Sequence, residues 1–334
     1  MASQRSTQLI HVQGLTKRYG DKLALDNVSF DVQSGEVLGL LGLNGAGKST
    51  AMNIITGYIG ATCGTVTVDG HDAAEDPLAA KRVIGYLPEQ LAFYSDMRVR
   101  EYLNFVCDLK GVRQRRQQHL ASICERVGIA HMANRMIRNL SKGYRQRLGF
   151  AQALIGDPKV LILDEPTVGL DPSQIIEIRE LIRQAGKASA VIISSHVLSE
   201  IQAMCTRVVV LHYGRVLADD TPERLSKTVF ATHRILARIE GEPAEVQTAL
   251  SQVPAVADVR VLAQTEPNAF DYVIESAERR DIRADVFRAL AKADLPLLST
   301  HGNEASLEDI FLHLVADQEQ NAKRNEQDGS HTQA

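Results

Sequence analysis

The stretch Gly42-Leu43-Asn44-Gly45-Ala46-Gly47-Lys48-Ser49-Thr50 decides the fold of this chain. It fits the pattern G-x-x-x-x-G-K-[ST], follows an apolar run typical of a strand, and precedes a helical pattern over residues 51–56. Glycines let backbone N–H groups turn toward phosphate oxygens, and the following helix adds its positive end. Lys48 is expected to reach the terminal phosphates, and the Ser49 hydroxyl to ligate Mg²⁺. The loop predicts a nucleoside triphosphate site, which leaves kinases, GTPases, helicases and transport ATPases open.

A second motif is an apolar strand that ends in two adjacent acids, VLILDEP at residues 160–166. Neighbouring side chains of a strand point to opposite faces, so the two carboxylates are expected to have different tasks. Asp164 is predicted to hold Mg²⁺ through the metal's water shell. Glu165 is predicted to orient or deprotonate an attacking water, as hydrolysis of a triphosphate requires.

Between these motifs lies LSKGYRQR at residues 140–147. With the spacing of the other two motifs, it resembles the signature of ATP-binding cassette proteins, whose usual form is LSGGQ. The resemblance extends from about residue 9 to residue 224. It implies an α/β fold with a P-loop NTPase core, made of a mostly parallel sheet and an antiparallel β subdomain, with an inserted helical subdomain. Beyond this range the alternation of β-like and helical segments predicts a small α+β accessory domain at the carboxyl end.

The resemblance also implies how ATP is bound. Ser141 and Gly143 of one subunit contact the γ-phosphate that Lys48 of a second subunit holds, and Lys142 and Tyr144 belong to the same binding segment. ATP then joins two subunits head to tail, the second being another copy of this chain or a related ATPase. Lys142 and Tyr144 stand where the family usually has Gly and Gln.

Three further positions take their roles from the resemblance. Tyr19 is expected to stack on adenine, although a half-buried tyrosine at a strand end is an alternative interpretation. Asp171, in the segment GLDP, is expected to contact the other subunit. His196, after the apolar run VIISS, is expected to contact the γ-phosphate as a catalytic switch.

One position departs from the family pattern. In LPEQLAFYSDM the resemblance places Glu89, and not Gln90, where most members have a glutamine that ligates the metal. A carboxylate can still bind Mg²⁺. Glu89 therefore joins Ser49 and Asp164 in the predicted metal set, and Gln90 is the alternative.

The domain boundaries are predicted from changes in the residue pattern along the chain. We predict an ATPase domain at 7–228 with its helical subdomain at about 90–157, an accessory domain at 229–316, and a disordered tail at 317–334. In the accessory domain β-like and helical segments alternate as βαββαβ. Its last predicted element is the capped helix SLEDIFLHLV at 306–315.

Composition limits the function classes. The chain has 334 residues, of which 44% are hydrophobic, and its 37 Lys plus Arg against 41 Asp plus Glu leave a net charge of −4. Such a chain is globular, and the acidic balance argues against a nucleic-acid partner. The four cysteines have no metal-binding spacing and are expected to be reduced thiols. No apolar stretch reaches the roughly 20 residues of a membrane span, and no secretory signal is seen, so a cytoplasmic location is expected.

The combination of LPE, LSKGYRQR and SLEDIFLHL most resembles ATPase subunits of exporters of the drug-resistance and gliding-motility group. This resemblance implies transport through a separate membrane permease and a place at the inner face of the cytoplasmic membrane. Residues 93–105 are the candidate permease contact, with ordinary packing inside the domain as the alternative. The resemblance implies an accessory domain that contacts the partner ATPase or regulates it, and a domain that only stabilises the dimer is the alternative. The transported substrate is not readable from this chain.

Two other functions fit the sequence less well. A soluble cassette ATPase acting on ribosomes or DNA usually has two cassettes or a long coiled coil, whereas this chain has one phosphate loop and no sustained heptads. A small-molecule kinase would need neither LSKGYRQR nor His196.

Overall fold

The computed structural model describes residues 8–195, 197–229, 234–266, 268–277 and 281–302. The chain divides into two compact units, Met1–Pro222 and Glu223–Ala334. Helix α8, Pro222–Val229, begins at this division. The predicted boundary at 228–229 lies at the other end of α8.

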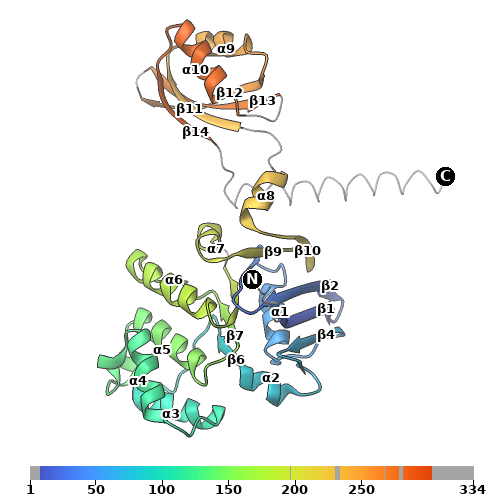
Figure 1. The fold of residues 1–334 in the computed structure, drawn as a ribbon, viewed down its shortest axis with the longest axis vertical. Helices are drawn as coiled ribbons and strands as arrows, with labels where there is room; N and C mark the ends of the chain where they lie inside the picture. The colour runs from blue at the N-terminus through green and yellow to red at the C-terminus, as the bar shows by residue number, and fades with distance from the viewer. Residues whose placement is uncertain (1–7, 196, 230–233, 267, 278–280, 303–334) are drawn as a thin grey trace, which may run out of the picture. The chain divides into compact units, whose positions relative to one another are not determined.

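The first unit contains two sheets (Figure 1). One is antiparallel and has the strand order β2-β1-β4-β5, and the other has the order β10-β9-β3-β8-β7-β6. In the second sheet β9, β3, β8, β7 and β6 run parallel, and β10 pairs antiparallel at one edge. The strands are β1 Gln8–Tyr19, β2 Lys22–Gln33, β3 Val37–Leu41, β4 Cys63–Val68, β5 His71–Asp72, β6 Ile84–Leu87, β7 Val160–Asp164, β8 Ala190–Ser194, β9 Arg207–His212 and β10 Arg215–Asp220.

The core of this unit explains the short apolar runs of the sequence. Every residue of β3, β7 and β8 is buried, as expected for central strands covered on both faces. Helix α1, Lys48–Ile55, packs with β1, β2 and β4 and with β3 and β7 in one continuous apolar cluster. Helices α6, Pro172–Gly186, and α7, Leu198–Met204, contact β8 and β3. The parallel sheet therefore holds the loop before α1 in a fixed place.

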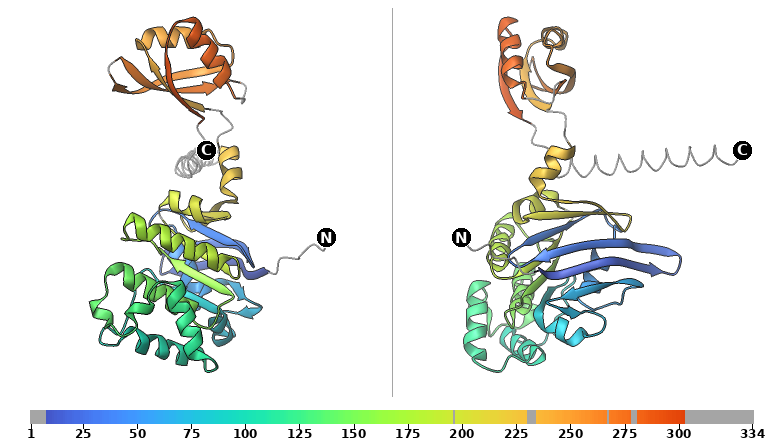
Figure 2. Two further views of the ribbon diagram at one scale, coloured as in Figure 1. Left: turned by 60° about the vertical axis from the view of Figure 1, so that its left-hand side comes forward. Right: turned by 45° about the vertical axis from the view of Figure 1, so that its right-hand side comes forward.

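The helices that follow β6 form a separate group (Figures 1 and 2). They are α3 Val99–Lys110, α4 Arg116–Arg126 and α5 Lys142–Leu154, with short 3-10 turns at Ala130–Met132 and Ile137–Asn139. Helix α2, Pro77–Val83, precedes β6. Helix α5 packs against β6 at the edge of the parallel sheet. This group is the helical insertion that the sequence predicts, and α5 carries the LSKGY segment at its start.

The second unit has its own sheet, with order β12-β13-β11-β14 and all neighbours antiparallel. Its elements are β11 Arg234–Glu240, α9 Pro243–Ser251, β12 Val256–Glu266, β13 Ala269–Ser276, α10 Arg283–Lys292 and β14 Leu297–Gly302. Residues of both helices and of β11 and β13 share one apolar cluster. The chain order is βαββαβ. The predicted helix at 306–315 and the predicted tail at 317–334 lie outside the described residues.

Among the described residues, no helix is both long and apolar enough to cross a membrane.

Candidate nucleotide site

The phosphate loop connects the buried strand β3 to helix α1, and its glycines meet two different demands. Gly47 caps the helix with a φ of 105°, a conformation that strains residues with a Cβ atom. Gly42 is needed for close approach, since a Cβ atom there would lie 2.5 Å from the carbonyl oxygen of Leu211. The N-terminus of α1 thus points its free N–H groups into the loop, where they can bind an anion.

A cavity of about 340 Å³ opens over this loop. It is lined by residues from β1, β2, the loop, α1 and the ends of β6 and β7. These residues are Tyr19, Lys22, Ala24, Asn44, Gly45, Gly47, Lys48, Ser49, Thr50, Glu89, Glu165 and Val168. Residues that lie far apart in the sequence therefore meet at one cavity, and most of them belong to the predicted set.

Lys48 is the buried cation among the described residues that line this cavity, whereas Lys22 is exposed. It is only 7% exposed, and its Nζ donates hydrogen bonds to the carbonyl oxygens of Gly42, at 2.6 Å, and Leu43, at 3.3 Å. Burial lowers the pKa of Lys48, and the negative charges of Glu165, Asp164 and Glu89 act in the opposite direction. The ammonium group is therefore partly desolvated and held by weak neutral acceptors. Such a group gains strongly from a bound phosphate.

The two acids at the end of β7 are fixed by one serine of β8. Asp164 is buried and accepts a hydrogen bond from the hydroxyl of Ser194. The backbone N–H of Glu165 donates to the same hydroxyl oxygen, at 3.0 Å, and to the Ser194 carbonyl, at 3.2 Å. Glu165 has a φ of 49°, which is unusual for a residue other than glycine. Asp164 is the last residue of strand β7, whereas Glu165 lies just beyond the strand and lines the cavity.

Tyr19 lies at the end of β1 and is 49% exposed. One side of its ring faces the ammonium of Lys17, whose Nζ lies 5.1 Å from the ring centroid. The same Nζ donates to the Gly60 carbonyl at 2.7 Å, which ties Lys17 to the segment after α1. The tyrosine is therefore presented to the cavity and is not packed in the core.

Glu89 and Gln90 follow β6 and are both exposed. Glu89 lines the cavity, and its charge acts on Lys48. Gln90 is not among the described residues that line it. The position of Glu89 agrees with the metal role predicted for it, which stays a prediction.

The LSKGY residues lie elsewhere, at the start of α5. Ser141 is the N-cap of this helix and accepts a hydrogen bond from the Tyr144 N–H at 3.4 Å. The Tyr144 hydroxyl lies 3.2 Å from Nε2 of His131. Ser141, Lys142, Gly143 and Tyr144 are not among the described residues that line the cavity. Within one chain, the structure does not bring them to the phosphate loop.

Asp171 caps the next helix, α6. Its carboxylate accepts hydrogen bonds from the Ser173 hydroxyl, at 2.7 Å, and the Gln174 N–H, at 2.9 Å. These bonds, that of Ser173 foremost, hold the pKa of Asp171 below its usual value. Asp171 therefore has a structural task inside its own chain, and the predicted contact with a second subunit stays a prediction. His196 lies outside the described residues.

Sequence reasoning missed two groups around this site. Lys22 lines the cavity from β2, and Ser194 binds both acids from β8. A signal existed for Ser194, because a polar residue ending an apolar strand beside VLILD is expected to lie at the same sheet edge. For Lys22 the sequence offered only its place three residues after Tyr19.

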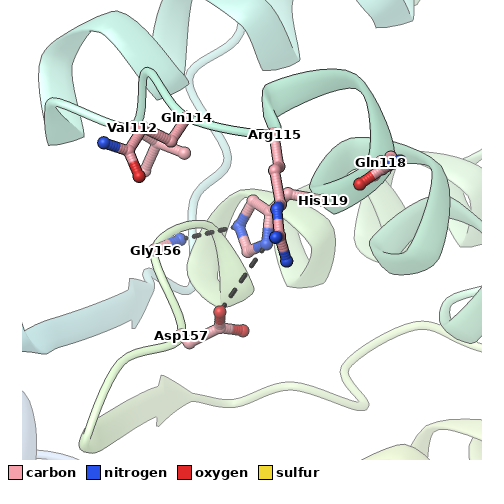
Figure 3. Close-up of a pocket in the computed structure, with 7 residues that line it drawn as sticks. All are labelled: Val112, Gln114, Arg115, Gln118, His119, Gly156 and Asp157. Atoms are coloured by element: carbon pink, nitrogen blue, oxygen red, sulfur yellow. Dashed lines mark hydrogen bonds and ion pairs between the residues drawn. The ribbon is translucent and has the colours of Figure 1, made fainter.

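A second cavity, of about 490 Å³, lies between α4 and the turn after α5 (Figure 3). At its edge Nε2 of His119 accepts a hydrogen bond from the Gly156 N–H at 3.0 Å, and Nδ1 lies 3.7 Å from Asp157. These contacts join α4 to the turn. None of the described residues that line this cavity belongs to the phosphate loop, and the cavity above α1 stays the candidate triphosphate site.

The fold and the site together define a P-loop nucleoside triphosphatase. The sequence model of the family described as ABC transporter matches residues 25–168. The ABC transporter ATP-binding protein YdbJ of Bacillus subtilis, called uncharacterized, is 32% identical over 91% of this chain and 94% of its own. The daunorubicin resistance ATP-binding protein DrrA3 of Streptomyces coeruleorubidus is 32% identical over 92% of this chain and 96% of its own. The chain belongs to the ATP-binding proteins of ABC transporters.

A solved structure agrees with this assignment. The dimeric structure of MJ0796, a bacterial ABC transporter cassette, is 25% identical, covers 64% of this chain and 98% of that chain, and has a TM-score of 0.59. The expected α/β cassette fold and the family resemblance are thereby confirmed. The chain is an ATP-binding subunit of an ABC transporter and an ATPase.

Proposed function

We propose that this chain energises an exporter as a head-to-tail dimer, in which each of two ATP molecules lies between the phosphate loop of one chain and the α5 N-terminus of the other. The observation that carries the proposal is the separation of the two binding segments. Lys48 and Ser49 line the cavity, whereas Ser141 and Gly143 lie outside its lining. A second chain would supply what a single chain lacks, and the cassette of MJ0796 is described as dimeric.

The roles inside the site follow from the geometry of the chain itself. The α1 N-terminus and Lys48 bind the phosphates, and Tyr19 provides a ring for the adenine base. Glu165 is the group that orients and deprotonates the attacking water, because it lines the cavity beside Lys48 while Asp164 stays bound to Ser194. ATP contacts both chains and so stabilises the closed dimer over the open one.

The oxygen donors of the site fit Mg²⁺. Ser49 and Glu89 line the cavity, and Asp164 ends β7 next in sequence to Glu165, which also lines it. Hydroxyl and carboxylate oxygens are the ligands that this hard cation prefers. Mg²⁺ would neutralise charge on the phosphates, and these three residues would hold it. Gln90 is the alternative to Glu89.

Export through a separate permease is supported by the relatives. The daunorubicin resistance protein DrrA3 aligns over 92% of this chain, including its second unit. A permease would place the chain at the inner face of the cytoplasmic membrane. The segment at residues 93–105 is the proposed contact, since Tyr94 is exposed and its ring lies 5.6 Å from that of Phe105 in an edge-on arrangement.

Capture of a trapped dimer tests the proposal. Glu165→Gln keeps the phosphate contacts and removes the base, so the variant should bind ATP, fail to turn it over, and elute as a dimer with ATP and Mg²⁺. Tagged Glu165→Gln chain recovered from solubilised native membranes should carry a multispanning protein in stoichiometric amount, identified by mass spectrometry.

The matched control is the double variant Glu165→Gln with Lys48→Met, which lacks the phosphate-binding ammonium and should remain monomeric under the same conditions. A Glu165→Gln chain that stays monomeric with saturating ATP contradicts the dimer. Recovery of ribosomal proteins, DNA-bound proteins or no partner contradicts the transporter assignment and favours the soluble ATPase alternative.

A further inference from the structure

The start of α5 is packed directly on the segment that follows Glu165. Gln146, in the second turn of the helix, is only 6% exposed, and its Nε2 donates a hydrogen bond of 2.7 Å to the carbonyl oxygen of Pro166. Pro166 is the residue after Glu165. One buried side-chain amide therefore joins the LSKGY helix to the catalytic segment of the same chain.

The backbone at Glu165 needs such support. A φ of 49° is strained in a residue with a side chain and persists only where the surroundings impose it. Upstream, Ser194 binds the Glu165 N–H. Downstream, Gln146 binds the Pro166 carbonyl, and the buried Thr167 hydroxyl donates to the buried carboxylate of Glu200. The conformation of Glu165 is thus fixed from both sides.

Other contacts make α5 and this segment one packed body. A Cβ atom at Gly169 would collide with Nζ of Lys142, and one at Gly143 would lie 2.5 Å from the amide of Gln174. One turn further along α5, Arg147 forms an ion pair with Glu177 of α6. A displacement of the α5 N-terminus would be carried to residues 166–177 through these contacts.

We propose that Gln146 is a positioning residue that couples the two ATP sites of the dimer. The inference rests on the proposed function, in which the α5 N-terminus contacts ATP held by the second chain. When that ATP draws the α5 N-terminus toward the partner, Gln146 moves the Pro166 peptide with it and sets the orientation of Glu165 in its own site. Each base reaches its full rate only when the ATP of the other site is bound by the α5 N-terminus, and loss of that contact slows the base without stopping it.

Gln146→Met tests this role, because methionine fills a similar volume and has no donor for the Pro166 carbonyl. A loss of alignment at the reacting centre can cost up to about 100-fold in rate. We expect kcat for ATP to fall at least about 10-fold, with the ATP dissociation constant within about two-fold of the wild-type value. The readouts are steady-state ATPase rates and binding of a fluorescent ATP analogue.

The matched control is Gln152→Met. Gln152 lies on the same helix and accepts a hydrogen bond from the Tyr102 hydroxyl of α3, away from the cavity. The chemical change and the helix are the same, so general weakening of α5 would affect both variants alike. The control should keep kcat near the wild-type value.

A second variant provides a test with its own signature. In Gln146→Glu, a protonated carboxyl can donate to the Pro166 carbonyl and an ionised carboxylate cannot. Burial raises the pKa of a carboxyl group, so the ratio of its kcat to that of the wild type should increase as pH is lowered from 8 to 6. A residue with a merely structural role would not give this pH profile.

The outcomes separate this inference from the proposed function. The coupling role is wrong if folded Gln146→Met keeps the wild-type kcat, or if the ratio of the Gln146→Glu kcat to the wild-type kcat does not change with pH. Neither result would contradict the head-to-tail dimer or the role of Glu165 as the base. If Glu165→Gln with native Gln146 fails to dimerise on ATP, the proposed function fails first. A ten-fold loss of kcat in Gln146→Met, with Gln152→Met unaffected, supports the coupling.

Discussion

Ser194 Oγ accepts a hydrogen bond of 3.0 Å from the backbone N–H of Glu165. The same hydroxyl donates to Asp164, the neighbouring acid. Strands β7 and β8 are in register at this point, since Asp164 pairs with Ser194 across the ladder. One serine thereby holds the carboxylate proposed for the metal and the backbone of the proposed base, so the two acids are positioned together.

Ser194→Ala should therefore lower turnover. Without the hydroxyl, the Glu165 N–H has one acceptor fewer and the Asp164 carboxylate is free to rotate. Because both acids then lose their alignment, we expect kcat to fall by about 10-fold with little change in ATP affinity. The free energy of unfolding should fall by about 1–3 kcal/mol. Ser189→Ala is the control, because the Ser189 hydroxyl binds the Pro158 carbonyl at 2.7 Å beside the other end of β8. Equal loss of activity in both variants would contradict the role of Ser194.

Lys48→Met should weaken ATP binding by at least about 10-fold, since a lost charge-assisted hydrogen bond costs about 1.5–3 kcal/mol. Titration with a fluorescent ATP analogue measures the dissociation constant. Lys110→Met is the matched control. Its amine also donates to backbone carbonyls, those of Lys81 and Ile84, and burial also lowers its pKa, but it lies away from the phosphate loop. If Lys48→Met bound ATP as tightly as the wild type, the assignment of residues 42–50 as the phosphate-binding loop would be wrong.

The sequence predicted the phosphate loop and both acids because each motif is local. Spacing alone places Lys48 at the start of a helix and Glu165 at the end of a strand. The partner of Ser194 depends on the register between β7 and β8, which no short pattern encodes. The bond from Gln146 to Pro166 joins positions 20 residues apart and could be found only from packing. The alternation of β-like and helical segments likewise predicted the strands and helices of the second unit, but it did not predict the order of the strands in the sheet.

Glu89→Gln tests which residue supplies the metal ligand. Loss of one negative charge lowers affinity for a hard cation, so the Mg²⁺ concentration for half-maximal ATPase activity should rise by roughly 3- to 10-fold. Gln90→Ala should leave it unchanged, and excess EDTA should abolish turnover in all variants. A rise in the Mg²⁺ requirement in Gln90→Ala alone would assign the metal to Gln90 instead.

Ser141→Arg tests the contact between subunits. Bulk and charge at the α5 N-terminus should abolish turnover while ATP binding to the phosphate loop is retained.

Mixing Ser141→Arg with Lys48→Met is the decisive measurement. A mixed dimer contains one intact site, made by Lys48 of the first chain and Ser141 of the second, so the mixture should exceed the summed activity of the two variants alone. A mixture with no added activity would mean that both segments act within one chain. Ser251→Arg, in the exposed end of α9, is the control for the added arginine.

Tyr272→Phe probes the core of the second unit. Tyr272 of β13 is fully buried in the apolar cluster, and within the described residues its hydroxyl has no hydrogen-bond partner. Burial raises the pKa of Tyr272, and the charge of Glu242 adds to the effect, so the hydroxyl is held neutral in an environment that solvates it poorly. Removing an unpaired buried hydroxyl relieves its desolvation cost, so the free energy of unfolding should stay equal or rise by up to about 1 kcal/mol. Urea unfolding of the full chain, followed by circular dichroism, measures the change.

Tyr102→Phe is the control. There the lost hydroxyl is bonded to Gln152, so the same substitution should be destabilising by about 1 kcal/mol. A destabilised Tyr272→Phe would show that the hydroxyl has a partner in solution, and the core of this unit would then be polar at its centre.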